Sequence, residues 1–158
     1  MGFQLRSPGF EHQGAIPARH TCQGDDAAPE LAWSDPPGGT KTFALIVDDP
    51  DAPDPRAPRT IWVHWLLYNL PAATRALSEG MIDAALPLGT REGINDFKET
   101  GYRGPCPPIG RHRYFFKLYA LDAELTDLRT PTKAQLEKAM QGHVLAEAHL
   151  VGTYEKRK

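Results

Sequence analysis

The sequence lacks three features that define large classes of proteins: long apolar runs, an excess of one charge, and many cysteines. No stretch approaches the roughly 18 consecutive apolar residues that a membrane-spanning helix needs. The formal net charge is only -2 and basic residues are scattered, so no positive surface for nucleic acid is predicted. The N-terminus shows no basic segment followed by an apolar run. These absences predict a soluble, cytoplasmic protein that binds no nucleic acid.

The two cysteines are too few for the disulfide framework of a small secreted protein. His20, Cys22, Cys106 and His112 are ligand types that zinc prefers, but their spacing fits no zinc motif, so no metal is predicted. A disulfide between Cys22 and Cys106 is the better alternative if their loops touch, although a reducing cytoplasm argues against it. Nucleotide-binding fingerprints are also missing, and no cofactor is expected.

The sequence is rich in loop-forming residues, because 15 prolines and 14 glycines separate its short apolar runs. This pattern is typical of strands joined by shaped loops, and 158 residues suffice for one domain. Strands are predicted over 42–47, 61–70, 113–121 and 149–154, and one helix after Thr130 or Thr132. The long connection 71–111 has only a short helical turn near 77–85, and long connections are usually functional.

Side-chain alternation predicts which residues share a face of each strand. Along 61–70, one face is expected to carry Trp62, His64, Leu66 and Tyr68, and the other Val63, Trp65 and Leu67. Along 113–121, His112 and Tyr114 are expected to face together, while Arg113 faces away and pairs with a carboxylate. In both strands, a histidine is therefore expected near the start of a face that is otherwise largely apolar.

An acidic run, Asp48 to Pro53, is expected to form a turn that ends the strand over 42–47. Alone, such a turn is usually only solvated. The proline-rich segment from Gly104 to Gly110 is expected to form a rigid wall whose glycine amides can bind a small anion. With His64 and His112 near Asp49, the charge of the site would be adjustable near neutral pH, and a protonated histidine favours phosphate.

An enzyme is the alternative interpretation of the same residues. Asp49 beside His64 or His112 could act in proton transfer, and Cys106 could be a nucleophile. A cysteine between Pro105 and Pro107 lacks the helix N-terminus that often activates a thiol, and the sequence has no serine nucleophile elbow. We therefore expect a binding protein without catalytic residues, and keep a small-molecule hydrolase or lyase as the second hypothesis.

Several ordered motifs support this expectation by resemblance. They include Asp49-Pro50-Asp51-Ala52-Pro53, Trp62 to His64, Asn95-Asp96-Phe97, Gly101 to Pro108, Gly110 to Tyr114 and the segment from Gly142 to Tyr154. In wording and order they resemble the phosphatidylethanolamine-binding protein family, in particular its bacterial, Raf-kinase-inhibitor-like branch, over nearly the whole chain. The resemblance implies a mainly β protein, a Greek-key β-sandwich with a peripheral C-terminal helix.

The resemblance also implies a small pocket for phosphate or phosphorylethanolamine-like groups. By position, the implied ligand-binding residues are Asp49, Asp51, Pro53, Trp62, His64, Gly104, Pro105, Cys106, His112 and Tyr114. The two histidines and Gly104 are expected nearest the anion. The resemblance further implies modulation or inhibition of a partner protein, either a kinase or a protease, and it implies a homodimer because similar bacterial proteins pair.

Overall fold

The computed structural model describes residues 2–80 and 85–157 and contains two antiparallel β-sheets. Pairing orders the small sheet β1-β2-β5 and the large sheet β6-β4-β3-β7-β8. The elements are β1 (Gln4–Arg6), the 3-10 helix η1 (Ala18–His20), β2 (Leu31–Ser34), β3 (Thr42–Ala52), β4 (Thr60–Pro71), β5 (Ala76–Leu77), β6 (Arg91–Glu92), β7 (Arg111–Leu121), α1 (Lys133–Met140) and β8 (Val144–Glu155).

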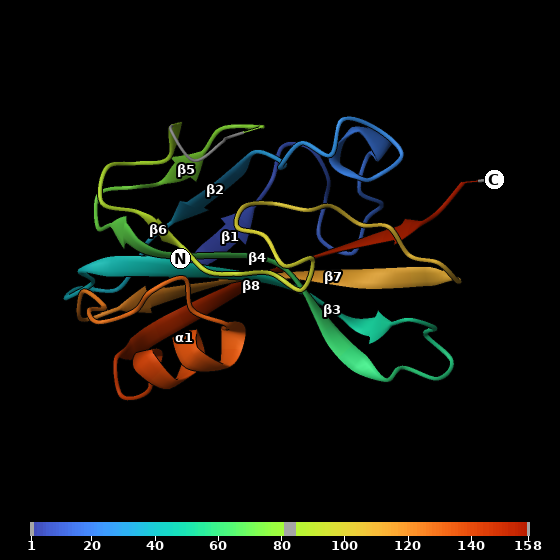
Figure 1. The fold of residues 1–158 in the computed structure, drawn as a ribbon. Helices are drawn as coiled ribbons and strands as arrows, with labels where there is room; N and C mark the ends of the chain where they lie inside the picture. Colours follow the sequence, from blue (N-terminus) through green and yellow to red (C-terminus); the bar gives the residue numbers. More distant parts are fainter. Residues whose placement is uncertain (1, 81–84, 158) are drawn as a thin grey trace.

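The large sheet has a covering layer on each face. Figure 1 shows the small sheet and the N-terminal loops on one side and α1 on the other. One hydrophobic cluster joins the two sheets, for example Trp33 of β2 with Phe43 of β3. A second cluster joins β3 and β4 to Leu136 and Met140 of α1. The predicted mainly β sandwich with one peripheral helix is therefore confirmed.

The central strand β3 is longer than predicted. Its run from Phe43 to Val47 is buried on both faces, as expected for a β-branched and aromatic strand between two layers. The acidic run does not end it, because β3 continues to Ala52. The reason is that Asp48, which is 1% exposed, is paired with Lys117 of β7 and Lys133 of α1 and so is not a solvated turn residue.

Strand β4 departs from the predicted alternation because its pairing with β3 contains a bulge. Val47 opposes Trp65 and Asp48 opposes Val63, so His64 is an extra residue on β4. As a result Val63 packs in the cluster under α1, whereas Trp65 packs between the sheets. The prediction that His64 shares a face with Leu66 and Tyr68 is wrong for this reason.

The remaining elements follow their sequence patterns more closely. On β7, Tyr114, Phe116 and Leu118 face the core between the sheets, as predicted. Helix α1 begins after Thr132, whose side chain accepts from Gln135 N–H while the Gln135 side chain accepts from Thr132 N–H, which forms a capping box. β8 starts at Val144, earlier than predicted.

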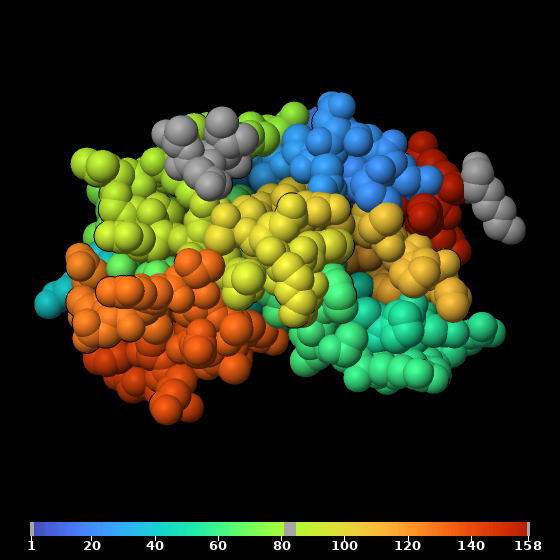
Figure 2. Space-filling view, viewed as in Figure 1, coloured from blue at the N-terminus to red at the C-terminus, as the bar shows by residue number. Residues whose placement is uncertain are grey.

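In its described part, the connection between β4 and β7 contains the short strands β5 and β6 as its only named elements. Residues 81–84 of the predicted helical turn near 77–85 lie outside the described residues, and Leu77 belongs to β5. Figure 2 shows the later part of this connection on the surface, between the N-terminal loops and the β3–β4 hairpin. Among the described helices, none is long and apolar enough to cross a membrane.

Candidate functional site

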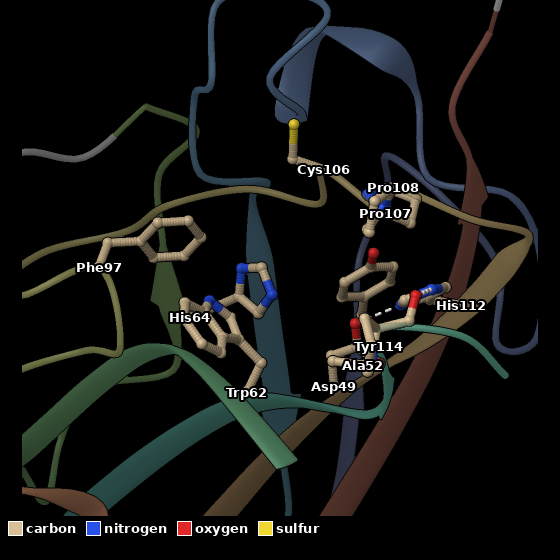
Figure 3. A pocket seen from close by; sticks show the side chains of 11 residues that line it. Asp49, Ala52, Trp62, His64, Phe97, Cys106, Pro107, Pro108, His112 and Tyr114 are labelled. Atoms are coloured by element: carbon tan, nitrogen blue, oxygen red, sulfur yellow. Dashed lines mark hydrogen bonds and ion pairs between the residues drawn. The ribbon is translucent and has the colours of Figure 1, made fainter. Parts of the chain in front are cut away.

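Three distant segments enclose a cavity of about 260 Å³ at the end of the large sheet. They are the β3–β4 hairpin, the loop before β7 with its proline-rich wall, and the start of β7 (Figure 3). Most of the surface is apolar and aromatic. The lining residues are Asp49, Ala52, Pro53, Trp62, His64, Phe97, Cys106, Pro107, Pro108, His112 and Tyr114.

The structure brings seven of the ten predicted ligand-binding residues into this lining. They are Asp49, Pro53, Trp62, His64, Cys106, His112 and Tyr114. Sequence reasoning did not select Ala52, Phe97, Pro107 or Pro108 as site residues. Pro107 and Pro108 lie within the predicted wall and Ala52 lies within the acidic run. Their position in these two segments could have indicated that they line the site. For Phe97, the only sequence signal was its place in one of the motifs that carry the resemblance. Its contact with Trp62 and His64 depends on the path of a long loop, which local patterns do not predict.

Three predicted residues, Asp51, Gly104 and Pro105, lie outside the lining. Asp51 is held by Arg113, whose Nε and Nη2 approach its carboxylate oxygens to 3.0 and 2.8 Å. The guanidinium hydrogen bond is the main reason that the pKa of Asp51 is below its usual value. This is the carboxylate pair that the sequence predicted for Arg113.

Gly104 is committed to the N-terminal loops. Its N–H donates to Oδ1 of Asp26 at 2.9 Å, so this amide is used inside the protein and not by an anion. A Cβ atom at this position would lie only 2.1 Å from the carbonyl oxygen of His20. Glycine is therefore needed here for the close approach of two loops.

Asp49 and His112 form a buried pair. His112 Nδ1 lies 2.6 Å from Oδ2 of Asp49, and His112 Nε2 lies 2.9 Å from the carbonyl oxygen of Ile109 and 3.1 Å from that of Pro53. Carbonyl oxygens only accept hydrogen bonds, so Nε2 must carry a proton. One further proton lies between Nδ1 and the carboxylate, and the pair as a whole therefore carries no net charge.

Burial has the largest influence on the pKa of Asp49. It raises the pKa of Asp49, and the hydrogen bond from His112 and the N–H of Asp51 act against this increase. Because both N–H groups of His112 point to protein acceptors, the ring lines the cavity without offering a donor to a ligand. The sequence correctly placed His112 beside Asp49 but did not predict that carbonyl groups would occupy its second nitrogen.

His64 presents the opposite hydrogen-bonding character. Its Nδ1 lies 2.6 Å from the carbonyl oxygen of Arg103, which fixes the proton on this nitrogen and leaves Nε2 as an acceptor. The ring lies between Phe97 and Tyr114, with ring centroids 5.4 and 5.3 Å away (Figure 3). Burial lowers the pKa of His64 to about 4, so the imidazole is neutral at pH 7.

Tyr114 supplies a buried donor. Its hydroxyl has no hydrogen-bond partner among the described residues, although the side chain is 1% exposed. Burial raises the pKa of Tyr114, and the phenol therefore stays protonated. Unpaired buried polar atoms are rare in proteins, and one at a cavity marks a place for a ligand or water.

The wall of the cavity is joined to the N-terminal loops by a disulfide between Cys22 and Cys106, whose Cα atoms are 5.4 Å apart. The sequence left this bond open as an alternative that requires the two loops to touch, and the structure contains it. The hydrogen bond from Cys22 N–H to the Pro105 carbonyl and that from the Tyr102 hydroxyl to the His20 carbonyl show that the loops do touch. The disulfide also removes both thiolates from the zinc alternative, and the described residues hold no cluster of three potential metal ligands.

Comparison with known proteins places the chain in a family. The phosphatidylethanolamine-binding protein profile matches residues 6–155. A UPF0098 protein of Methanothermobacter thermautotrophicus is 46% identical, with 96% of this chain and 98% of the relative aligned.

Two crystal structures share the fold. One is a putative phosphatidylethanolamine-binding protein homologue from Chlamydia trachomatis, with a TM-score of 0.89, 42% identity and 99% of both chains covered. The other is Escherichia coli YbcL, described as a member of the mammalian family, with a TM-score of 0.89, 32% identity, and 99% of this chain and 100% of that chain covered. The chain belongs to the phosphatidylethanolamine-binding protein family.

Proposed function

We propose that this protein binds a small anion with a phosphoryl group, such as phosphate or a phosphorylethanolamine head group, in the cavity below the proline-rich wall. The observation that carries the proposal is the buried hydroxyl of Tyr114, which has no partner among the described residues and lies at an otherwise largely apolar cavity. A phosphoryl oxygen is a strong acceptor and would satisfy this donor.

The size and composition of the cavity support a small ligand. About 260 Å³ accommodates a phosphoryl group with a short substituent, but not a whole lipid. Trp62 and Phe97 form an edge-to-face pair with ring centroids 5.5 Å apart, and they supply apolar surface for the substituent. Between Pro105 and Pro108, only Cys106 has a backbone N–H.

Binding agrees better with this geometry than the enzyme alternative does. A general base needs a nitrogen or carboxylate oxygen that reaches the substrate. In the Asp49–His112 pair, both ring nitrogens already contact protein oxygens. His64 Nε2 does reach the cavity, but burial lowers the pKa of His64 to about 4, so this nitrogen is a weak base. Cys106 is in the disulfide and is not a free nucleophile. Modulation of a partner protein, the homodimer and the cytoplasmic location stay predictions, and the disulfide is a reason to test the location.

A single hydroxyl deletion tests the proposal. Phosphorylethanolamine would be titrated into the wild type and Tyr114→Phe at pH 6, with binding followed by calorimetry. We expect the variant to bind about tenfold more weakly, because its buried donor is lost while the ring stays. Tyr119→Phe is the matched control, since Tyr119 lies on the same strand but packs towards α1. Equal binding by Tyr114→Phe and wild type, or no binding by the wild type, would contradict the proposal.

A further inference from the structure

Two buried side chains of the cavity each present a polar atom to a ligand, and these two atoms have opposite hydrogen-bonding character. The Tyr114 hydroxyl donates, and Nε2 of His64 accepts, because the single proton of the His64 ring is on Nδ1 and donates to the Arg103 carbonyl. A fully ionised phosphoryl group has only acceptors. It would satisfy Tyr114 but would place an oxygen lone pair against the lone pair of His64.

Among the described residues, the charges around His64 oppose burial only weakly and do not make its Nε2 a donor. Asp48 is held by two lysines, and Asp96 accepts the N–H of Val63 at 2.7 Å. Arg103 points its guanidinium towards Asp26 and Glu99. His112 is paired with Asp49, and Tyr114 stays an uncharged phenol. Burial therefore dominates, and the neutral imidazole is the stable form.

The cavity also lacks a net positive charge. No lysine or arginine of the described chain lines it, and the Asp49–His112 pair is neutral as a whole. A dianion would be buried without a counter-charge and beside the Asp49 carboxylate, which is costly. A monoanion that keeps one acidic proton meets both conditions, because it carries less charge and can donate to His64.

We propose that the site is selective for the protonated, monoanionic form of a phosphoryl group, and that His64 Nε2 is the specificity-determining acceptor for its P–OH. This inference rests on the proposed function and adds the protonation state of the ligand. It predicts that an anion of the same size and charge without a proton is rejected. If the ligand has no proton to donate, the buried acceptor of the site is left unpaired, and this weakens binding.

Methyl phosphate and methyl sulfate make a matched pair of probes. At pH 5 both carry one negative charge and have nearly the same shape, but only methyl phosphate has an acidic proton, since the second pKa of a phosphoester is about 6. Titration of the intact, oxidised protein should show methyl phosphate binding at least about tenfold more tightly than methyl sulfate. Methyl phosphate affinity should then fall about tenfold for each pH unit well above that pKa.

Proton counting tests the same inference without any substitution. Calorimetry at pH 7.5 in two buffers with different ionisation enthalpies should show uptake of close to one proton for each methyl phosphate bound. Replacing His64→Gln should reduce the preference between the two probes, because a side-chain amide can turn to present either a donor or an acceptor. His149→Gln, at an exposed position on β8, is the control and should keep the wild-type preference.

The outcomes separate this inference from the proposed function. Equal affinity for both probes, or methyl phosphate binding that does not change from pH 5 to 8, would overturn the selectivity while the anion site stands. Tighter binding of methyl sulfate would show that His64 is a donor and would also overturn it. If neither probe nor phosphorylethanolamine binds at any pH, the proposed function itself fails.

Discussion

The imidazole of His64 and the phenol of Tyr114 meet edge to face across the cavity, with ring centroids 5.3 Å apart and an interplanar angle of 81°. One comes from a bulge in β4 and the other from the regular part of β7. Their contact joins an acceptor and a donor in one cavity. It also makes His64 a buried titratable group whose charge state affects stability.

We predict that His64 makes the protein less stable in mild acid. Its pKa is about 4 in the folded protein against 6.5 for the ordinary side chain, so the unfolded chain takes up a proton first as pH falls. The contribution of the neutral His64 side chain to the free energy of unfolding is fully present above pH 6.5. About 3 kcal/mol of this free energy is lost as the pH falls from 6.5 to about 4. Urea unfolding at several pH values measures it, and His64→Gln should lose less stability over this range than wild type or His143→Gln.

Asp48 should be a major contributor to stability. Its side chain is 1% exposed and bridges Lys117 of β7 at 3.1 Å and Lys133 of α1 at 2.9 Å. Removing one partner of a buried ion pair usually costs about 3–5 kcal/mol, and Asp48→Ala should lower the free energy of unfolding by this amount. Asp122→Ala is the control, because its pair with His143 is about half exposed and should contribute no more than about 1 kcal/mol. A similar small loss for both variants would contradict the prediction.

The loop contact at Gly104 should tolerate no side chain. Gly104→Ala would place Cβ 2.1 Å from the His20 carbonyl oxygen and 2.6 Å from Oδ1 of Asp26. Both loops must shift, so we expect a loss of about 1–3 kcal/mol or more in thermal or urea unfolding. Gly38→Ala is the control, because nothing lies within 4 Å of the added atom. Wild-type stability of Gly104→Ala would show that these loops are not packed as described.

The disulfide should stabilise the fold by restricting the unfolded chain. Cys22 and Cys106 are 84 residues apart, and closing a loop of this length is expected to contribute about 4 kcal/mol. The double substitution Cys22→Ser and Cys106→Ser should lower the unfolding free energy by up to this amount. Reductant should destabilise the wild type but not the double variant. If reductant leaves the wild type unchanged, the bond does not contribute as proposed.

Sequence patterns predicted the buried β3 core, the face of β7 and the capped helix, because each depends on neighbours along the chain. The length of β3 was not predictable in this way. Whether Asp48 is solvated or buried depends on Lys117 and Lys133, which lie 69 and 85 residues away in the sequence. Local reasoning treats an acidic pair as a turn, and tertiary pairing overrides that preference.

The candidate site was predictable as a set of residues but not as a set of hydrogen bonds. The histidines, Asp49 and the proline wall stand out in the sequence, and most of them line one cavity. Which ring nitrogen is free depends on carbonyl groups of Arg103, Ile109 and Pro53, and every residue has a carbonyl. The exclusion of Gly104 similarly follows from Asp26, a contact across 78 residues.

The irregular pairing of β3 with β4 has a consequence for how the cavity can be altered. The β3–β4 pairing has three register shifts, and two of them, the one at His64 and one between Asp49 and Ala52, lie in the part that carries the polar groups. Deleting one residue at either shift would restore ordinary pairing and rotate the following side chains to the opposite face. A homologue could therefore retain every lining residue and the whole sandwich, yet lack this cavity, because of a single missing residue in this hairpin.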